Sequence, residues 1–243
     1  MKRTDGWALL WMPLAILCLA FLLVSNSPVR SHPPAPPANP PKLVALTFDD
    51  GPSPLYTPEI LQLLTTYNAH ATFFVLGSEV LRFPQVAAAI ARQGSVLANH
   101  GWQHLNLYRS GANVLWQDAH RAETYVRSLG LPMAPLYRPP YGNVSQTLLA
   151  IFSRHGYRVI LWSLDTRDWA HTNGHVIAQK ILHSIRPGSI VLMHDGGGDR
   201  APTVSALATI LNILSAQRYR FVTVPQLLSQ RPSPQAPTLK PVT

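Results

Sequence analysis

The sequence contains a single cysteine and few charged side chains. Cys18 stands in an apolar stretch near the N-terminus, which leaves the rest of the chain without a disulfide or a thiol nucleophile. There are 11 acidic residues against 20 basic ones, a formal net charge of +9. The basic residues are scattered, and no run of five or six indicates a nucleic-acid-binding segment. We therefore expect no nucleic-acid partner and interpret the charge as favouring solubility or attraction to an anionic surface.

The N-terminal segment contains the longest apolar run. Residues 7–24 follow Lys2 and Arg3 and approach the length that spans a bilayer, and cations before such a run favour an N-terminus on the inside. We expect residues 1–26 to be an uncleaved membrane anchor. The alternative is a cleaved signal peptide, although Ser25-Asn26-Ser27 fits a small-x-small site poorly. The protein is expected to be extracytoplasmic in both cases, membrane-anchored in the first and secreted in the second.

Proline-rich segments bound the remaining chain. Residues 27–41 have the composition of a polyproline II spacer, and residues 231–243 contain four prolines and are interpreted as a disordered tail. Between them, residues 42–230 leave about 190 residues for a single domain with a full hydrophobic core. We expect this domain to act as a monomer.

Short β-branched runs alternate with helical patterns along the domain. Thr57-Pro58-Glu59 predicts a helix start with Thr57 as its N-cap, and Gly94, Gly130 and Gly156 follow helical stretches as C-terminal glycines do. The alternation indicates a parallel sheet, in either a barrel or an open doubly wound arrangement. The candidate strands are residues 43–48, 72–76, 95–98, 136–138, 158–163, 189–193 and 219–224.

Polar side chains follow five of these strands, at the point where each ends. They are Asp49 and Asp50, His100 and His104, Arg138 and Tyr141, Asp165 and Asp168, and His194 and Asp195. A closed barrel gathers the carboxyl ends of all its strands into one mouth, whereas an open sheet brings together only those beside its switch point. The distribution therefore favours a (β/α) barrel, although Asp195 could equally be a loop cap.

The histidine pair and the aspartate pair together indicate a metal site. On one helical turn His100 and His104 would point the same way, and two imidazoles with one carboxylate make the open site of a hydrolytic metal. Such a spacing alone can arise by chance among ten histidines, and adjacent aspartates are often only turn caps. Without a cation, Asp49 and Asp50 facing one site would repel each other. With a cation, one can ligate while the other is a base, held ionised by Arg138.

Five segments in this order resemble the motifs of the polysaccharide deacetylases, carbohydrate esterase family four. They are Thr47-Phe48-Asp49-Asp50-Gly51-Pro52, residues 100–104, Arg138-Pro139-Pro140-Tyr141, residues 165–169 and Leu192-Met193-His194. The resemblance extends over about residues 42–228 and implies a distorted (β/α) barrel of seven or eight strands. That fold agrees with the count of candidate strands.

The resemblance implies a role for each site residue. Asp50, His100 and His104 would bind a divalent metal, usually zinc, with cobalt or nickel as alternatives. Asp49 would be the catalytic base, oriented by Arg138. The backbone N–H of Tyr141 would hold the oxyanion.

The remaining roles concern the leaving group and the substrate. His194 would protonate the departing amine, with Asp168 orienting its imidazole. Tyr141, Trp169 and Leu192 would contact substrate, the last two around the acetyl methyl. Outside the motif set, Arg138 could be a surface cation, Trp169 a core aromatic and Leu192 merely the last core residue of its strand.

The resemblance implies metal-dependent hydrolysis of N-acetyl groups from an amino-sugar polymer, with release of acetate. Peptidoglycan or chitin-like N-acetylglucosamine chains are the expected substrates. The alternatives are an O-acetyl xylan esterase and a catalytically silent glycan-binding module. The family usually has Ser or Thr where Gly101 stands, so the hydroxyl that braces this loop is missing. Residues 196–198 are three glycines, interpreted as a flexible rim because no Lys-Ser/Thr follows them.

Overall fold

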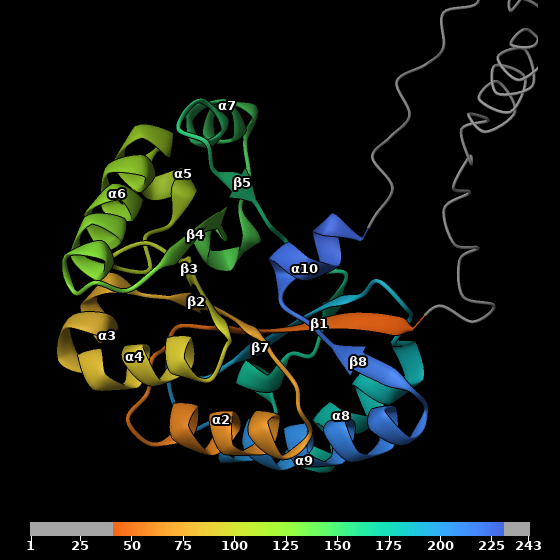
Figure 1. Ribbon diagram of the computed structural model, residues 1–243. Coiled ribbons are helices and arrows are strands. Elements are labelled where there is room, and N and C mark those ends of the chain that lie inside the picture. The colour runs from red at the N-terminus through yellow and green to blue at the C-terminus, as the bar shows by residue number, and fades with distance from the viewer. Residues whose placement is uncertain (1–40, 231–243) are drawn as a thin grey trace, which may run out of the picture. The chain divides into compact units, whose positions relative to one another are not determined.

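The computed structural model describes residues 41–230, so the expectations for the anchor, most of the spacer and the tail lie outside these residues. Eight parallel strands form one sheet in the order β5-β4-β3-β2-β1-β7-β6, and β8 pairs with β1 (Figure 1). They are β1 Lys42–Asp49, β2 Thr72–Val75, β3 Val96–Asn99, β4 Met133–Tyr137, β5 Arg158–Val159, β6 Leu164–Asp165, β7 Ile190–His194 and β8 Tyr219–Phe221. The predicted α/β class and parallel sheet are confirmed.

The sheet curls into a distorted barrel that its hydrogen bonds leave open on one side. Residues 158–163 were expected to form a single strand, and that expectation is wrong. Its first residues form β5, which pairs with β4. The chain then crosses the gap and forms β6, which pairs with β7. Ile160 N donates to Tyr137 O at 2.8 Å, whereas Ser163 N donates to Ile190 O at 2.9 Å on the other side. One segment thus spans the two edges of the sheet, and complete closure is not seen in the described chain.

Helices cover the outside of the curled sheet, with α2, α8 and α9 along one side of it in Figure 1. The helices are α2 Tyr56–Thr66, α3 Gly77–Arg82, α4 Pro84–Arg92, α5 Leu107–Ser110, α6 Ala112–Ser128, α7 Gln146–Arg154, α8 Gly174–Ser184, α9 Ala201–Ala216 and α10 Val224–Ser229, with short 3-10 turns at Pro140–Gly142 and Asp168–Ala170. Within residues 41–230, none combines the length and the apolar character needed to cross a membrane.

The helix ends test the predicted caps. Gly94, Gly130 and Gly156 have φ of 87°, 73° and 78° just beyond α4, α6 and α7, which confirms them as C-terminal glycines. Thr57, in contrast, lies inside α2, whose N-cap position is Leu55. The Thr57 hydroxyl accepts a hydrogen bond from Ser53 N at 2.8 Å and donates to Asp195, so it ties two loops together instead of capping a helix.

The two faces of the sheet have different cores. The outer face packs against α2, α4, α8 and α9 in the main hydrophobic cluster. On the inner face, Ala45 of β1 and Phe74 of β2 pack with Val224 and Leu227 of α10. Because side chains alternate along a strand, Thr47 and Asp49 lie on the same inner face as Ala45. The interior is thus apolar at one end and polar at the carboxyl ends of the strands, where the site lies.

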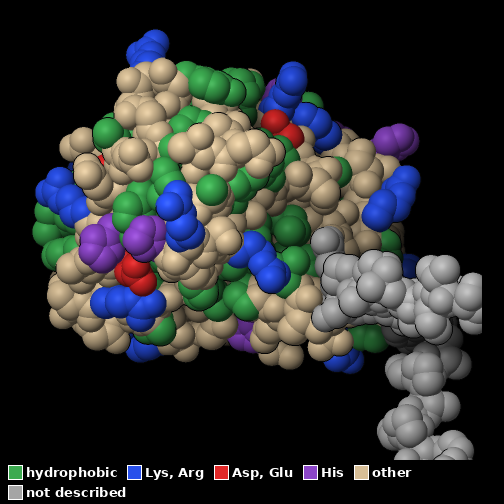
Figure 2. All heavy atoms as spheres, turned by 90° about the horizontal axis from the view of Figure 1, so that it is seen from above, with side chains coloured by type: hydrophobic (Ala, Val, Ile, Leu, Met, Phe, Trp, Pro, Cys, Tyr) green, Lys and Arg blue, Asp and Glu red, His purple; other side chains and the backbone are tan. Residues whose placement is uncertain are grey.

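Figure 2 shows that Lys and Arg side chains are spread singly over the face in view and do not form a continuous stripe. The basic side chains on this face are therefore dispersed.

Candidate active site

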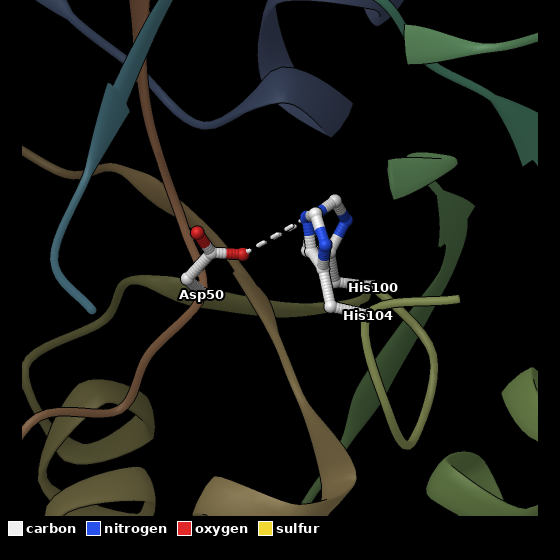
Figure 3. Close-up of side chains that lie close together, drawn as sticks. All are labelled: Asp50, His100 and His104. Carbon is white, nitrogen blue, oxygen red and sulfur yellow. Dashed lines mark ion pairs between the residues drawn. The ribbon is translucent and has the colours of Figure 1, made fainter. Parts of the chain in front are cut away.

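Asp50, His100 and His104 come together at the carboxyl ends of β1 and β3 (Figure 3). Asp50 Oδ1 lies 3.4 Å from His100 Nε2 and 3.5 Å from His104 Nε2. Asp50 directly follows β1 and has a φ of 72°, which turns its carboxylate away from the strand direction and toward the histidines. The three ligand atoms lie within 4.8 Å of one another, a separation that suits a single cation.

The chemistry of these three groups fits a divalent metal. Asp50 Oδ1 is buried and has no hydrogen-bond partner among the described residues, which is costly unless a cation accompanies it. His100 Nδ1 lies 2.7 Å from the carbonyl oxygen of Arg138. Because a carbonyl only accepts, Nδ1 carries the hydrogen and Nε2 is left to bind a metal. Two imidazole nitrogens and one carboxylate oxygen are ligands typical of zinc and similar ions.

The charges around the metal candidate favour an ionised carboxylate. Burial by itself would raise the pKa of Asp50, but His100 and His104 outweigh it and hold this pKa below its usual value. Burial likewise opposes a charge on His100, yet Asp49 and Asp50 raise its pKa above the usual value. A proton and a cation therefore compete for His100 Nε2.

The loop that carries the histidines is not the helical turn expected from their spacing. Residues 100–104 form an irregular loop after β3, so the histidines converge because the chain bends there. Trp102 N donates to Asp118 Oδ2 at 2.7 Å, and Gln103 N donates to the same oxygen at 3.2 Å. Asp118 belongs to α6, so a carboxylate from outside the loop provides the bracing that a hydroxyl at position 101 would otherwise supply.

Gly101 is suited to this arrangement by its backbone and its surroundings. Its φ is 91°, a conformation that L side chains rarely adopt. A Cβ at this position would come 2.5 Å from Asp118 Oδ2. Gly101 N donates to Asn99 Oδ1 at 2.8 Å, which fixes the start of the loop. Glycine at 101 and aspartate at 118 therefore depend on each other.

Asp49 is buried at the end of β1, with one carboxylate oxygen on Arg138 and the other toward His100. Its Oδ1 accepts a hydrogen bond from Arg138 Nη1 at 2.7 Å, and its Oδ2 lies 3.9 Å from His100 Nε2. Arg138 is fully buried, which excludes the surface-cation interpretation. Its Nη1 also donates to Thr47 Oγ1 at 2.8 Å, and its guanidinium carbon lies 4.0 Å from the ring centre of Phe74. The arginine thus holds one oxygen of Asp49 and leaves the other toward the metal candidate.

His194 and Asp168 form a second pair across the site. Asp168 Oδ1 lies 2.7 Å from His194 Nδ1, and its Oδ2 accepts from His194 N at 2.8 Å and from Thr203 Oγ1 at 2.8 Å. Burial would lower the pKa of His194, but the hydrogen bond and charge of Asp168 outweigh it and raise this pKa. The imidazole is therefore held in one orientation and is easier to protonate than a free imidazole.

The triglycine segment after His194 is braced, which corrects the expected flexible rim. Arg200 is buried and donates from Nε to Gly196 O at 2.7 Å and from Nη2 to Gly197 O at 3.0 Å. A Cβ at Gly196 would collide with the carbonyl of Asp50, and one at Gly197 would come 2.9 Å from Asp50 Oδ2. Glycine lets this segment pass directly against the metal candidate.

Asp195 lies beneath the same segment and is completely buried. It accepts a hydrogen bond from the Thr57 hydroxyl, and its Oδ1 has no partner within the described chain. Burial raises the pKa of Asp195 to about 7, since Thr57 compensates only in part and Asp50 and Asp49 repel a further charge. Asp195 N also donates to Asp49 O at 3.1 Å. Asp195 therefore supports the turn at residues 49–51 from below and is more than a loop cap.

A cleft of about 550 Å³ extends from the metal candidate and Asp49 to His194. Tyr141 and Trp169 stand on its rim with exposed fractions of 61% and 60%, which excludes a core position for Trp169. Leu192 is buried and contributes to the cleft wall, so it serves both the core and the cleft. The predicted residues that line the cleft are Asp49, Asp50, His100, His104, Tyr141, Asp165, Trp169, Leu192 and His194.

Several residues of the site were not predicted from the sequence. Trp162 and Arg200 line the cleft, and Thr203 and Asp118 hold functional groups from helices. Trp162 stands between two segments of the motif set, which was a usable signal. No sequence signal indicated Asp118 or Thr203, because a polar residue inside a helical pattern most often faces solvent.

Known proteins resemble this chain in sequence and in fold. The family model described as polysaccharide deacetylase matches residues 37–160. A peptidoglycan-N-acetylglucosamine deacetylase from Bacillus cereus is 40% identical over 190 residues, which are 77% of this chain and 88% of that protein. A chitooligosaccharide deacetylase from Bradyrhizobium is 36% identical over 196 residues, 76% of this chain and 90% of the other.

The solved structures agree with the sequence comparison. The structure of the peptidoglycan deacetylase PdaC from Bacillus subtilis matches with a TM-score of 0.72 and 33% identity, and the match covers 78% of this chain and 91% of that one. The residues matched by the family model include Asp50, His100 and His104 of the metal candidate. By sequence, by fold and by the grouping of its site residues, this chain belongs to the polysaccharide deacetylase family.

Proposed function

We propose that the protein removes N-acetyl groups from N-acetylglucosamine units of a glycan polymer, peptidoglycan or a chitin-like chain, and releases acetate. The observation that carries this proposal is the pairing, in one cleft, of an Asp-His-His metal candidate with a base on one side and an oriented histidine on the other. The related deacetylases named above act on such acetylated amino sugars, which supports the choice of substrate.

The base is Asp49. Arg138 holds its Oδ1 at 2.7 Å, so its Oδ2 is free to take a proton from the attacking water. Asp50, His100 and His104 would hold a divalent cation, which would supply Lewis-acid polarisation of the acetyl carbonyl and a lower pKa for water. The backbone N–H of Tyr141 stabilises the negative charge that develops on the carbonyl oxygen.

The acid is His194. Its Nδ1 is bound to Asp168, so its Nε2 donates the proton that the departing amine needs. Without that proton the amine is a poor leaving group. Leu192 and Trp169 surround the acetyl methyl and, with Tyr141, orient the sugar in the cleft.

Zinc is the proposed metal, with cobalt or nickel as alternatives, because of the two nitrogen ligands and one oxygen ligand. Removal of the metal with a chelator should abolish acetate release, and added zinc or cobalt should restore it. His104→Ala should lose both metal binding and turnover. Full activity in a preparation shown to be free of metal would overturn the assignment.

Substrate comparison separates the proposed activity from its alternatives. The same groups could cleave an ester, so acetate release should be measured on chitooligosaccharide, peptidoglycan and acetylated xylan. Preference for xylan would favour an O-acetyl esterase. Glycan binding without acetate release at saturating metal would favour a silent binding module, an alternative that the complete set of catalytic side chains opposes.

Location is a separate proposal and rests on the sequence alone. The apolar run at residues 7–24 and the proline-rich spacer would place the domain outside the cytoplasm on a membrane anchor, as suits a polymer of the cell wall. Full-length protein should then fractionate with membranes and be released by protease that cuts within the spacer from the outer side. Protein found free in the medium and beginning near Ser25 would instead indicate a cleaved signal.

A further inference from the structure

The amino ends of the parallel strands form the end of the domain opposite the candidate active site. The segments that lead from a helix to the next strand lie at this end, because each helix runs back from the carboxyl ends of the strands. Within residues 41–230, none of these segments contains Asp or Glu. They are residues 67–71, 93–95, 129–132, 155–157, 185–189 and 217–218. The acidic side chains of the site all lie at the other end, so the two ends of the domain differ in charge.

Exposed cations gather where three neighbouring strands begin. Lys42 is the first residue of β1, Arg220 lies in β8 with Arg218 just before it, and Arg186 precedes β7. Because β8 and β7 both pair with β1, these starts lie side by side (Figure 1). Among the described residues, no carboxylate forms an ion pair with any of the four. We call Lys42, Arg186, Arg218 and Arg220 the basic face.

Helix stability explains only part of this distribution of charge. A cation in the last turn of a helix interacts favourably with the helix dipole, and Arg92, Arg127 and Arg154 hold such positions in α4, α6 and α7. The four residues of the basic face lie instead in strands or beyond the last residues of helices. The dipole effect falls off within the last turn, so it does not account for them.

We propose that the basic face binds an anionic lipid surface and thereby turns the catalytic cleft away from that surface. Negatively charged headgroups attract clusters of Lys and Arg, and the attraction acts over a Debye length of about 8 Å at physiological salt. Three of the four cations are guanidinium groups, which can donate two parallel hydrogen bonds to a phosphate. This role goes beyond deacetylation and does not depend on it.

The place where the chain enters the domain supports lipid over another anionic partner. Because β1 begins at Lys42, the preceding residues join the domain at the basic face. Between the apolar run at residues 7–24 and β1 there remain residues 25–41, which could extend to at most about 60 Å. An anchor formed by the apolar run would therefore hold the basic face, and not the cleft, next to the bilayer. The cleft would then open toward the polymer outside.

Hydrogen exchange of the full-length protein in lipid nanodiscs tests this orientation. Discs of phosphatidylcholine alone are compared with discs that also contain phosphatidylglycerol. The amides of residues 185–189 and 217–220 should exchange about three- to tenfold more slowly in the anionic discs, and high salt should remove the difference. Amides of the histidine loop, residues 100–104, should exchange equally in both.

Two double variants with the same change of charge separate the basic face from net charge. Arg218→Gln/Arg220→Gln should lose most of the protection in anionic discs. Arg82→Gln/Arg109→Gln removes two exposed cations from α3 and α5, which follow the carboxyl ends of β2 and β3, and should keep it. The melting temperature of each variant checks that it is folded.

Equal exchange in the two kinds of disc would overturn the role of the basic face. Protection by a soluble polyglycerol phosphate, without protection by anionic discs, would overturn the lipid partner and assign the face to an anionic polymer. If the mature protein begins near Ser25, it is instead sedimented with vesicles of the same two compositions. It should then pellet with the anionic vesicles only, and failure to do so would equally refute the lipid partner. Acetate release is measured separately, so deacetylation and lipid binding can fail independently.

Discussion

Two adjacent aspartates point in different directions because the strand ends between them. Asp49 keeps the alternation of β1 and faces Arg138, whereas Asp50 has a φ of 72° and faces the histidines. Asp49→Asn should therefore retain the metal and lose about two to four orders of magnitude in rate, because only proton transfer is affected. Asp50→Asn should weaken metal affinity. Metal content and acetate release measured on both variants check this, and equal loss of metal in the two would contradict the division of roles.

The pairing of His194 with Asp168 predicts a pH dependence. Asp168 raises the pKa of His194 against the effect of burial, so the protonated acid persists to higher pH than a free imidazole would. The alkaline limb of the pH–rate profile should report this group. Asp168→Asn removes the compensating charge, so the limb should move to lower pH and the rate should fall. Asp199→Asn, at an exposed position, should leave the limb in place, and an unmoved limb in Asp168→Asn would mean that another group is the acid.

At the scale of elements, the histidine loop depends on a helix that carries no ligand. Asp118 of α6 holds two backbone amides of residues 100–104. Asp118→Ala should weaken zinc affinity about ten- to a hundredfold, since groups that orient metal ligands typically contribute that much. Glu123→Ala, on the same helix and paired with Arg127, is the matched control and should bind zinc as wild type does. Zinc affinity is measured by competition with a chelator, with the melting temperature of the metal-free protein as a check on folding.

A second substitution tests the dependence of Gly101 on Asp118. Gly101→Ser would place a side chain at a φ of 91° and against the Asp118 carboxylate, so it should weaken zinc binding although the family resemblance implies Ser or Thr at this position. Unimpaired zinc binding by Gly101→Ser would show that the loop has room for the hydroxyl.

The sequence predicted elements well where a local rule decides them. Each of the expected strands overlaps an observed one, and the positive φ of Gly94, Gly130 and Gly156 follows from the freedom of glycine. Local rules failed where a tertiary contact decided the outcome. Thr57 is a residue type that commonly caps helices, yet its hydroxyl donates a hydrogen bond to the distant carboxylate of Asp195.

The same contrast holds in the site. Asp49 and Arg138 were correctly predicted to lie in the site because both stand at the ends of strands, and parallel strands bring their carboxyl ends together. The spacing of His100 and His104 suggested a helical turn, but the loop is shaped by Asp118, which lies 14 or more residues away in the sequence. Segment 158–163 was read as a single strand because periodicity cannot reveal a change of partner along it.

At the scale of the whole molecule, Asp195 couples stability to pH. Its pKa of about 7 in the folded protein exceeds the value of about 3.9 in an unfolded chain. Because the pKa is raised by folding, the contribution of Asp195 to the free energy of unfolding is fully present below about pH 4 and is lost as pH rises through 7. The loss is at most about 4 kcal/mol. In chelated protein, Asp195→Asn should therefore lose less stability between pH 5 and pH 8.5 than wild type does. Urea unfolding at both pH values measures this, with the exposed Glu59→Gln as control, and parallel losses in all three would refute it.

The gap between β5 and β6 predicts which part of the sheet opens most easily. Each of these strands is two residues long and pairs on one side only, whereas β1 pairs with β2, β7 and β8. Local opening costs least where few ladder bonds must break, so the amides of residues 158–165 should exchange with deuterium well before those of Lys42–Asp49. Trp162 belongs to this segment and lines the cleft. The wall of the cleft that contains Trp162 is thus expected to open more readily than the wall that carries Asp49 and Asp50.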